Sequence, residues 1–157
     1  MRSITRSASV VLVALACTSC TFESPLAPAL DVEHTTFASS LGIDLTTMTK
    51  TASGLYYQNV TVGAGAPTAA GNHVTVHYSG YLANGTEFDS SIGKTPFGFT
   101  LGAEQVIKGW DEGMLGVRVG GTRKLVIPSE LAYGGGSVGA IPPNSVLVFT
   151  VQLISIP

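Results

Sequence analysis

Hydrophobic and polar positions alternate along several short stretches of the chain from residue 55 onward. Residues 73–82 (HVTVHYSGYL) alternate most clearly, with Val74, Val76 and Tyr78 on one face. Such a period of two is typical of a strand that buries one face. Asn84-Gly85 follows and predicts a hairpin turn. The same pattern predicts further strands over residues 55–62, 86–90, 97–101, 122–127 and 146–154.

A helical period occurs in a single stretch of this region. Val106, Trp110 and Met114 recur every four residues, and the nearby glycines limit the helix to about two turns. The sequence therefore predicts the α+β class: an antiparallel sheet of about five strands with one short helix on its concave face. Residues 129–144 are too long for a simple connection, and we expect an ordered functional flap there.

The first 20 residues have the pattern of an export signal. Arg2 and Arg6 precede an apolar run over residues 8–16, which is too short to span a bilayer as a helix. Residues 13–17 (VALAC) resemble a bacterial lipobox, which makes Cys17 the candidate for lipidation and Cys20 its rival. We expect an exported protein of the periplasm or cell envelope, held to a membrane by this lipid. Simple secretion is the alternative.

Residues 21–53 are rich in Ser, Thr, Pro and Ala and predict a flexible, solvated spacer. Within it, residues 37–45 are the candidate for a short helix or turn that packs on the domain. The folded domain is predicted over residues 54–157.

Composition narrows the function. The 157 residues carry a net charge of −2, and only 11% of them are charged. Since no Lys/Arg cluster occurs, nucleic-acid binding is excluded. From residue 54 onward, six acids face five bases, a balance that suits uncharged or apolar ligands better than phosphates.

The usual catalytic motifs are absent from the sequence: there is no GxSxG, HExxH or P-loop. His73 and His77 could share a strand face, but no further ligands stand near them, so neither a metal nor a cofactor is expected. Aromatic residues on different predicted elements stand out instead. Together with Asp89 they suggest an apolar pocket with few polar groups; they are Tyr78, Phe88, Phe97, Phe99, Trp110, Tyr133 and Phe149.

Three strings in this region resemble the FKBP-type peptidyl-prolyl isomerase family. They are VHYSGYLANGTEFDSS, VIKGWDEGMLGVRVGGTRKLVIP and LAYG…IPPNSVLVFTVQL, in the family's order. The resemblance covers about residues 54–157 and implies a curved sheet wrapped around the short helix. It implies catalysis of X-Pro rotation in exported proteins, with proline-containing polypeptides as substrates and tacrolimus-type macrolides as ligands.

The resemblance also implies which residues act. The matches to the catalytic positions are Asp89, Tyr133, Ile107 and Trp110. The resemblance implies that the Ile107 amide and the Tyr133 hydroxyl donate hydrogen bonds to the substrate. The matches to the substrate-binding positions are Tyr78, Phe88, Phe97, Val106, Ile141 and Phe149. Phe99 is a further candidate for substrate binding, from the aromatic set above.

The chain departs from the family pattern in two loops. The stretch after Asp89 is one residue short and lacks the arginine that often pairs with this aspartate, so that Lys94 is the nearest base. The flap is also one residue short and is rich in glycine. Two other functions stay open at this point: a binding module with little turnover, and a lipid-tethered surface protein with a vestigial pocket.

Overall fold

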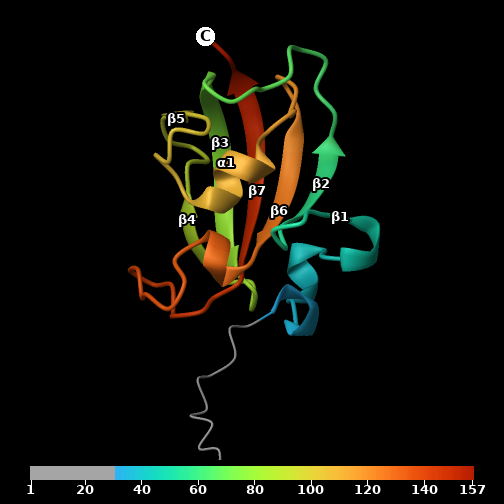
Figure 1. Cartoon of the computed structure of the whole chain (residues 1–157), viewed down its shortest axis with the longest axis vertical. Helices are drawn as coiled ribbons and strands as arrows, with labels where there is room; N and C mark the ends of the chain where they lie inside the picture. Colours follow the sequence, from blue (N-terminus) through green and yellow to red (C-terminus); the bar gives the residue numbers. More distant parts are fainter. Residues whose placement is uncertain (1–30) are drawn as a thin grey trace, which may run out of the picture.

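The computed structural model describes residues 31–157 and confirms the α+β class. A seven-stranded antiparallel sheet packs against one short α-helix (Figure 1). The strands are β1 (Thr49–Lys50), β2 (Tyr56–Thr61), β3 (His73–Leu82), β4 (Glu87–Ser90), β5 (Phe97–Thr100), β6 (Thr122–Ile127) and β7 (Leu147–Ser155). The helices are α1 (Lys108–Gly113) and four 3-10 turns, η1 (Val32–His34), η2 (Ser39–Leu41), η3 (Leu45–Thr47) and η4 (Ser129–Leu131).

The sheet has the strand order β1-β2-β6-β7-β3-β4, with β5 paired to β3. Its strand count exceeds the predicted five or so, because each of the six predicted ranges contains a strand and β1 is a seventh. β4 and β5 share one edge of β3, pairing with residues 79–81 and 73–76 respectively. In addition, β1 is a two-residue strand that pairs with β2 and was not predicted. The predicted Asn84-Gly85 turn is confirmed, because the Leu82 amide donates to the Thr86 carbonyl across it.

The main core lies between the concave face of the sheet and α1. Side chains from alternate positions of β7 are buried there, namely Leu147, Phe149, Val151 and Leu153. Leu125 and Ile127 of β6 join them, as do Trp110 and Met114 from the helical stretch. The apolar residues that recur every two positions in the strands and every four positions in the helix therefore pack together in one cluster.

Helix α1 lies unusually close to β6. A Cβ atom built on Gly109 would stand 2.5 Å from Ile127 Cγ2, and one on Gly113 would stand 2.7 Å from Leu125 Cδ2. Both distances are shorter than carbon atoms tolerate, so the helix face toward the sheet must carry glycine. The glycines that shorten the helix thus also permit its close packing.

The structure differs from the predicted spacer over residues 31–53. These residues form η1, η2, η3 and β1 and pack against the convex face of the sheet. Val32, Leu41 and Met48 are buried there with Tyr56 of β2, in a second core whose sheet side also contains Val126 and Val148. The candidate turn over residues 37–45 is confirmed by η2 and the start of η3.

Polar contacts complete this attachment. The Lys124 ammonium donates to the carbonyl of Leu41, and the Tyr56 hydroxyl donates to Glu33 at 2.6 Å. Lys50 pairs with the same carboxylate, and this ion pair holds the pKa of Glu33 below its usual range. The segment escaped prediction because its apolar residues follow neither a helical nor a strand period.

The segment predicted as a flap contains a 3-10 turn and is closed by hydrogen bonds. It begins with η4. Gly134 then makes two hydrogen bonds: its amide donates to the carbonyl of Ser129, and its carbonyl accepts from the amide of Asn144. A bridge between Val138 and Ile141 closes the glycine-rich turn.

The predicted export signal, both cysteines and the first part of the spacer lie outside the described residues. Within residues 31–157, no helix combines the length and apolar character that crossing a membrane requires.

The second core predicts a stability contribution from the N-terminal segment. We expect Leu41→Ala to lower the free energy of unfolding by about 2–4 kcal/mol, because Leu41 is buried and the change leaves a cavity. Urea denaturation measures this. Val62→Ala, at a side chain that is 72% exposed, serves as the control and should change stability by less than about 0.5 kcal/mol. Equal effects of the two variants would contradict the packing described here.

Candidate active site

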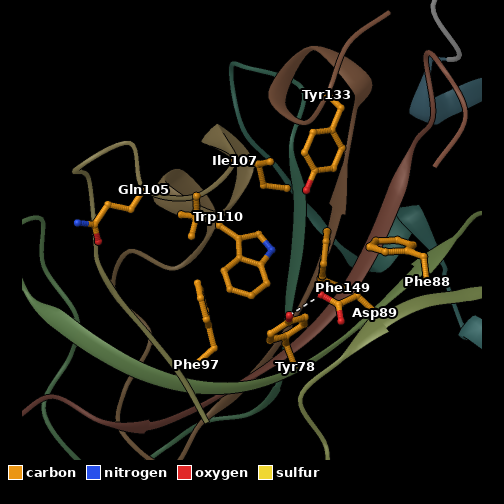
Figure 2. Close-up of a pocket in the computed structure, with 10 residues that line it drawn as sticks. Tyr78, Phe88, Asp89, Phe97, Gln105, Ile107, Trp110, Tyr133 and Phe149 are labelled. Carbon is orange, nitrogen blue, oxygen red and sulfur yellow. Dashed lines mark hydrogen bonds between the residues drawn. The ribbon is translucent and has the colours of Figure 1, made fainter. Parts of the chain in front are cut away.

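A pocket of about 210 Å³ opens between α1, the flap and the concave face of the sheet (Figure 2). Strands β3, β4, β5 and β7 supply its aromatic walls, while the loop before α1 and the residues after η4 supply its rim. Its lining residues are Tyr78, Phe88, Asp89, Phe97, Gln105, Val106, Ile107, Trp110, Tyr133 and Phe149.

Trp110 forms the floor of this pocket. Its side chain is only 4% exposed and is wedged between rings from three strands. Tyr78 and Phe149 meet it edge to face, with ring centroids 5.0 Å and 5.3 Å away. Such perpendicular contacts are favourable between aromatic rings and fix the indole plane. The floor is therefore rigid and apolar.

The indole N–H of Trp110 has no hydrogen-bond partner among the described residues. Figure 2 shows the nitrogen on the side of the ring that faces Phe149, and the two ring planes stand at 86°. Within residues 31–157 the indole N–H is therefore a buried donor without a partner at the floor of the pocket.

Asp89 is the one carboxylate that lines the pocket, and two donors orient it. The Tyr78 hydroxyl donates to Oδ2 at 2.6 Å, and the amide of Ser90 donates to Oδ1 at 2.8 Å. Lys94, the nearest base in sequence, instead donates to the carbonyl of Ser90. Tyr78 therefore takes the place of a basic partner for Asp89.

This contact also changes the acidity of Tyr78. Burial raises the pKa of the Tyr78 hydroxyl to about 12, and its hydrogen bond to the Asp89 carboxylate contributes in the same direction. Both act by disfavouring a phenolate at this position. Tyr78 is thus a neutral donor over the whole physiological pH range.

Two further donors stand at the rim. Ile107 immediately precedes α1, and within residues 31–157 its amide makes no hydrogen bond. The Tyr133 hydroxyl, which also has no partner in this part of the chain, points into the pocket in Figure 2. A bound carbonyl group would find neither donor occupied by a residue of the 31–157 range.

Asp111 holds the loop that forms the rim on this side. Its carboxylate accepts from the amide of Gly102 at 2.8 Å and from that of Glu104 at 3.1 Å. Glu104 has a φ of +55°, a strained value for a residue with a side chain. The two hydrogen bonds offset this strain and so position Gln105 and Val106, which follow directly.

Comparisons with known proteins agree with this site. Residues 65–154 match the family described as "FKBP-type peptidyl-prolyl cis-trans isomerase". This chain belongs to that family. A relative from Neisseria meningitidis serogroup B, named FK506-binding protein, is 50% identical over 105 residues, which are 66% of this chain and 96% of the relative. The chain is accordingly a peptidyl-prolyl cis-trans isomerase.

Solved structures give the same result. FkpA from Escherichia coli is 42% identical with a TM-score of 0.65, over 74% of this chain and 54% of FkpA. A peptidyl-prolyl isomerase from Pseudomonas syringae is 35% identical with a TM-score of 0.63, over 69% of this chain and 80% of that one.

The structure of this FKBP-type isomerase brings most of the predicted site residues together. Two do not line the pocket. Phe99 is 2% exposed and lies behind Phe97 and Trp110, because it faces the core from β5. Ile141 is 5% exposed and belongs to the core under the flap. Gln105 also lines the pocket, although it was not predicted as a site residue. Its position in the sequence, directly before the predicted site residues Val106 and Ile107, could have indicated this.

The first prediction for this isomerase concerns the acidity of Tyr78. We expect Asp89→Asn to lower the pKa of Tyr78 from about 12, because the hydrogen bond to a charged carboxylate is lost. The pKa should stay above its usual value of 10.0, because burial, the larger cause of the shift, remains. The stability that the neutral phenol contributes should be lost as the pH rises from about 10 to about 12, since the unfolded chain ionises first.

The difference in phenolate absorbance between each protein and its Tyr78→Phe counterpart measures this titration. A midpoint near 10 in the otherwise unaltered protein would contradict the burial of this hydroxyl.

A second prediction concerns the rim loop. Asp111→Ala should raise amide hydrogen exchange at Gly102 and Glu104 by about tenfold or more, because a hydrogen bond to a charged group contributes about 1.5–3 kcal/mol. Glu104→Gly relieves the backbone strain, so the loss in kcat/KM that Asp111→Ala causes should be smaller in that background. Unaltered exchange at both amides would show that Asp111 does not hold the loop.

Proposed function

We propose that this isomerase binds the proline ring of its substrates over Trp110 and accelerates rotation about the preceding peptide bond in exported proteins. One observation carries the proposal: an aromatic pocket with two donors at its rim that have no partner within residues 31–157. The pocket of about 210 Å³ has room for a prolyl ring.

The reaction is a rotation about one peptide bond and breaks no σ bond. Rotation about a peptide bond meets a barrier of about 18–20 kcal/mol, because resonance gives the C–N bond partial double-bond character. The cis and trans forms of an X-Pro bond differ by only about 0.5–1 kcal/mol, yet they exchange over tens to hundreds of seconds. A catalyst must therefore bind the twisted amide better than the planar one.

The apolar walls favour the twisted form. A planar amide is stabilised by a charge-separated resonance form, which water solvates. The walls of the pocket replace that water with surfaces that solvate charge poorly. These walls are formed by Tyr78, Phe88, Phe97, Val106 and Phe149. The twisted amide has less charge separation and loses less. A difference of about 4–8 kcal/mol would accelerate rotation by roughly 10³–10⁶-fold.

The rim donors hold the substrate backbone while the bond turns. The amide of Ile107 donates to one carbonyl and the Tyr133 hydroxyl to a second. Two anchored carbonyls keep the chain in place on each side of the rotating bond, so rotation does not need to move the whole polypeptide.

Asp89 acts through its charge. Its position at the pocket wall, fixed by Tyr78 and Ser90, places a negative carboxylate near the substrate amide. A negative charge near the carbonyl oxygen disfavours the planar resonance form, in which that oxygen carries the larger negative charge. No proton transfer is involved, since rotation breaks no σ bond.

The same pocket is the proposed site for tacrolimus-type macrolides. The Neisseria relative is named for FK506 binding. A ligand that places a ring over Trp110 and a carbonyl against the Ile107 amide would exclude substrate. We therefore propose competitive inhibition by such macrolides.

Export is proposed from the first 20 residues, with lipidation at Cys17 or Cys20. Mass spectrometry of the mature N-terminus tests this. A diacylglyceryl cysteine at either position supports the anchor, while an unmodified N-terminus downstream of both supports simple secretion. A retained initial segment would contradict export.

NMR exchange spectroscopy on an X-Pro tetrapeptide tests the function without a coupling protease. We expect cis–trans exchange to accelerate when the protein is added and to return to the uncatalysed rate with a tacrolimus-type inhibitor. Macrolide binding without acceleration would identify a binding module. Neither binding nor acceleration would identify a vestigial pocket.

The charge of Asp89 should matter more for turnover than for folding. We expect Asp89→Ala to lower kcat/KM by about tenfold or more, which is about 1.4 kcal/mol, while the exposed position spares the fold. Glu87→Ala removes an equal charge from the same strand outside the pocket and should leave kcat/KM unchanged. Equal activity of Asp89→Ala and the unaltered protein would contradict the role of this carboxylate.

A further inference from the structure

A second groove of about 550 Å³ begins where the pocket ends. It shares Gln105, Val106, Ile107 and Tyr133 with the pocket, so the two cavities are continuous across the rim. Figure 2 shows Ile107 and Tyr133 together on one side of the Trp110 floor. Its remaining lining residues are Glu104, Lys108, Glu130 and Ala132.

This rim is one way by which a polypeptide substrate can leave the pocket. Ile107 and Tyr133, whose amide and hydroxyl have no partner within residues 31–157, line both cavities. A chain anchored by both therefore continues into the groove on one side of its proline. Since an extended chain advances about 3.3 Å per residue, two flanking residues extend about 7 Å beyond the pocket.

The charges of the groove are unbalanced and unpaired. Glu104 and Glu130 supply two carboxylates and Lys108 one ammonium, and none of them takes part in a salt bridge within residues 31–157. All three side chains are exposed, so each interaction with a ligand is screened and modest. The sum of their charges favours a cation.

The backbone that carries these charges is held in place. Glu104 is fixed through its amide by Asp111, and Lys108 is the first residue of α1. Glu130 lies in η4, whose hydrogen bonds run from Leu131 to Pro128 and from Gly134 to Ser129. The groove therefore does not need to form on binding, which favours its use as a subsite.

We propose that this groove is an extended substrate subsite that favours a Lys or Arg side chain near the isomerised proline. The inference rests on the proposed function of the pocket and names the class of substrate it prefers: cationic polypeptide segments. Glu104 and Glu130 are the specificity-determining residues, and Lys108 opposes them.

Four peptides of eight residues test the subsite. Each contains a central Ala-Leu-Pro-Phe, and a Lys or a Glu stands two residues outside this core, on either its N-terminal or its C-terminal side. Exchange spectroscopy at low salt gives kcat/KM for each. The ratio of the Lys peptide to the Glu peptide is compared within one protein at a time, so that losses of folded protein cancel.

We expect this ratio to be about 3–10 on one side of the proline and near 1 on the other. In the double variant Glu104→Gln/Glu130→Gln the raised ratio should fall to about 1 or below, and in Lys108→Gln it should rise. Glu87→Gln is the matched control, because it removes a carboxylate that lines neither cavity and should leave the ratio unchanged. Salt at about 0.5 M should also reduce the ratio.

Ratios near 1 on both sides would overturn the subsite, as would a raised ratio that survives the double variant or falls equally in Glu87→Gln. In all these cases the peptides are still isomerised, so the function of the pocket stands. If no peptide is isomerised by the unaltered protein, the proposed function itself fails and the subsite fails with it.

Discussion

The close contact between α1 and β6 is the constraint on which the site depends. Gly109 and Gly113 allow the helix backbone to lie against Ile127 and Leu125, where any larger residue would meet carbon atoms at less than 3 Å. The residue after Gly109 is Trp110, so this contact sets how deeply the indole lies in the concave sheet. If the helix lay farther from the sheet, the indole of Trp110 would move into the space that is now the pocket.

The sheet contributes a matching close approach on the opposite wall. A Cβ atom on Gly80 of β3 would stand 2.7 Å from the rings of Phe88 and Phe149, which therefore pack directly over the strand backbone. The pocket is thus enclosed by rings that cannot move apart without loss of packing. Apart from the indole N–H, its polar groups stand at the wall and the rim, where Tyr78 holds Asp89 and two donors have no partner within residues 31–157. This division between an apolar interior and a polar edge suits a reaction that needs desolvation and anchoring but no proton transfer.

Most of this arrangement could be predicted from the sequence, since alternation in residues 73–82 and 146–154 marks strands with one buried face. The helix was recognisable from Val106, Trp110 and Met114. Composition and spacing alone did not identify the activity, which came from the resemblance of ordered motifs. Three features escaped for physical reasons. Residues 31–53 have sparse, aperiodic apolar positions, although these residues bury a second core. Phe99 lies on the same face of β5 as Phe97, so alternation does not tell which of the two rings lines the pocket and which is buried beside it. Ile141 lies in a loop, whose side-chain directions no periodicity predicts.

The contact between a bound proline ring and Trp110 is the central claim, and intermolecular nuclear Overhauser effects test it most directly. A peptide with an isotope-labelled proline would be observed in the presence of the isomerase during cis–trans exchange. The account predicts effects between the prolyl ring protons and the protons of the Trp110 indole and the Phe97 ring. Accelerated exchange accompanied by effects to residues outside the pocket, and none to Trp110, would contradict it.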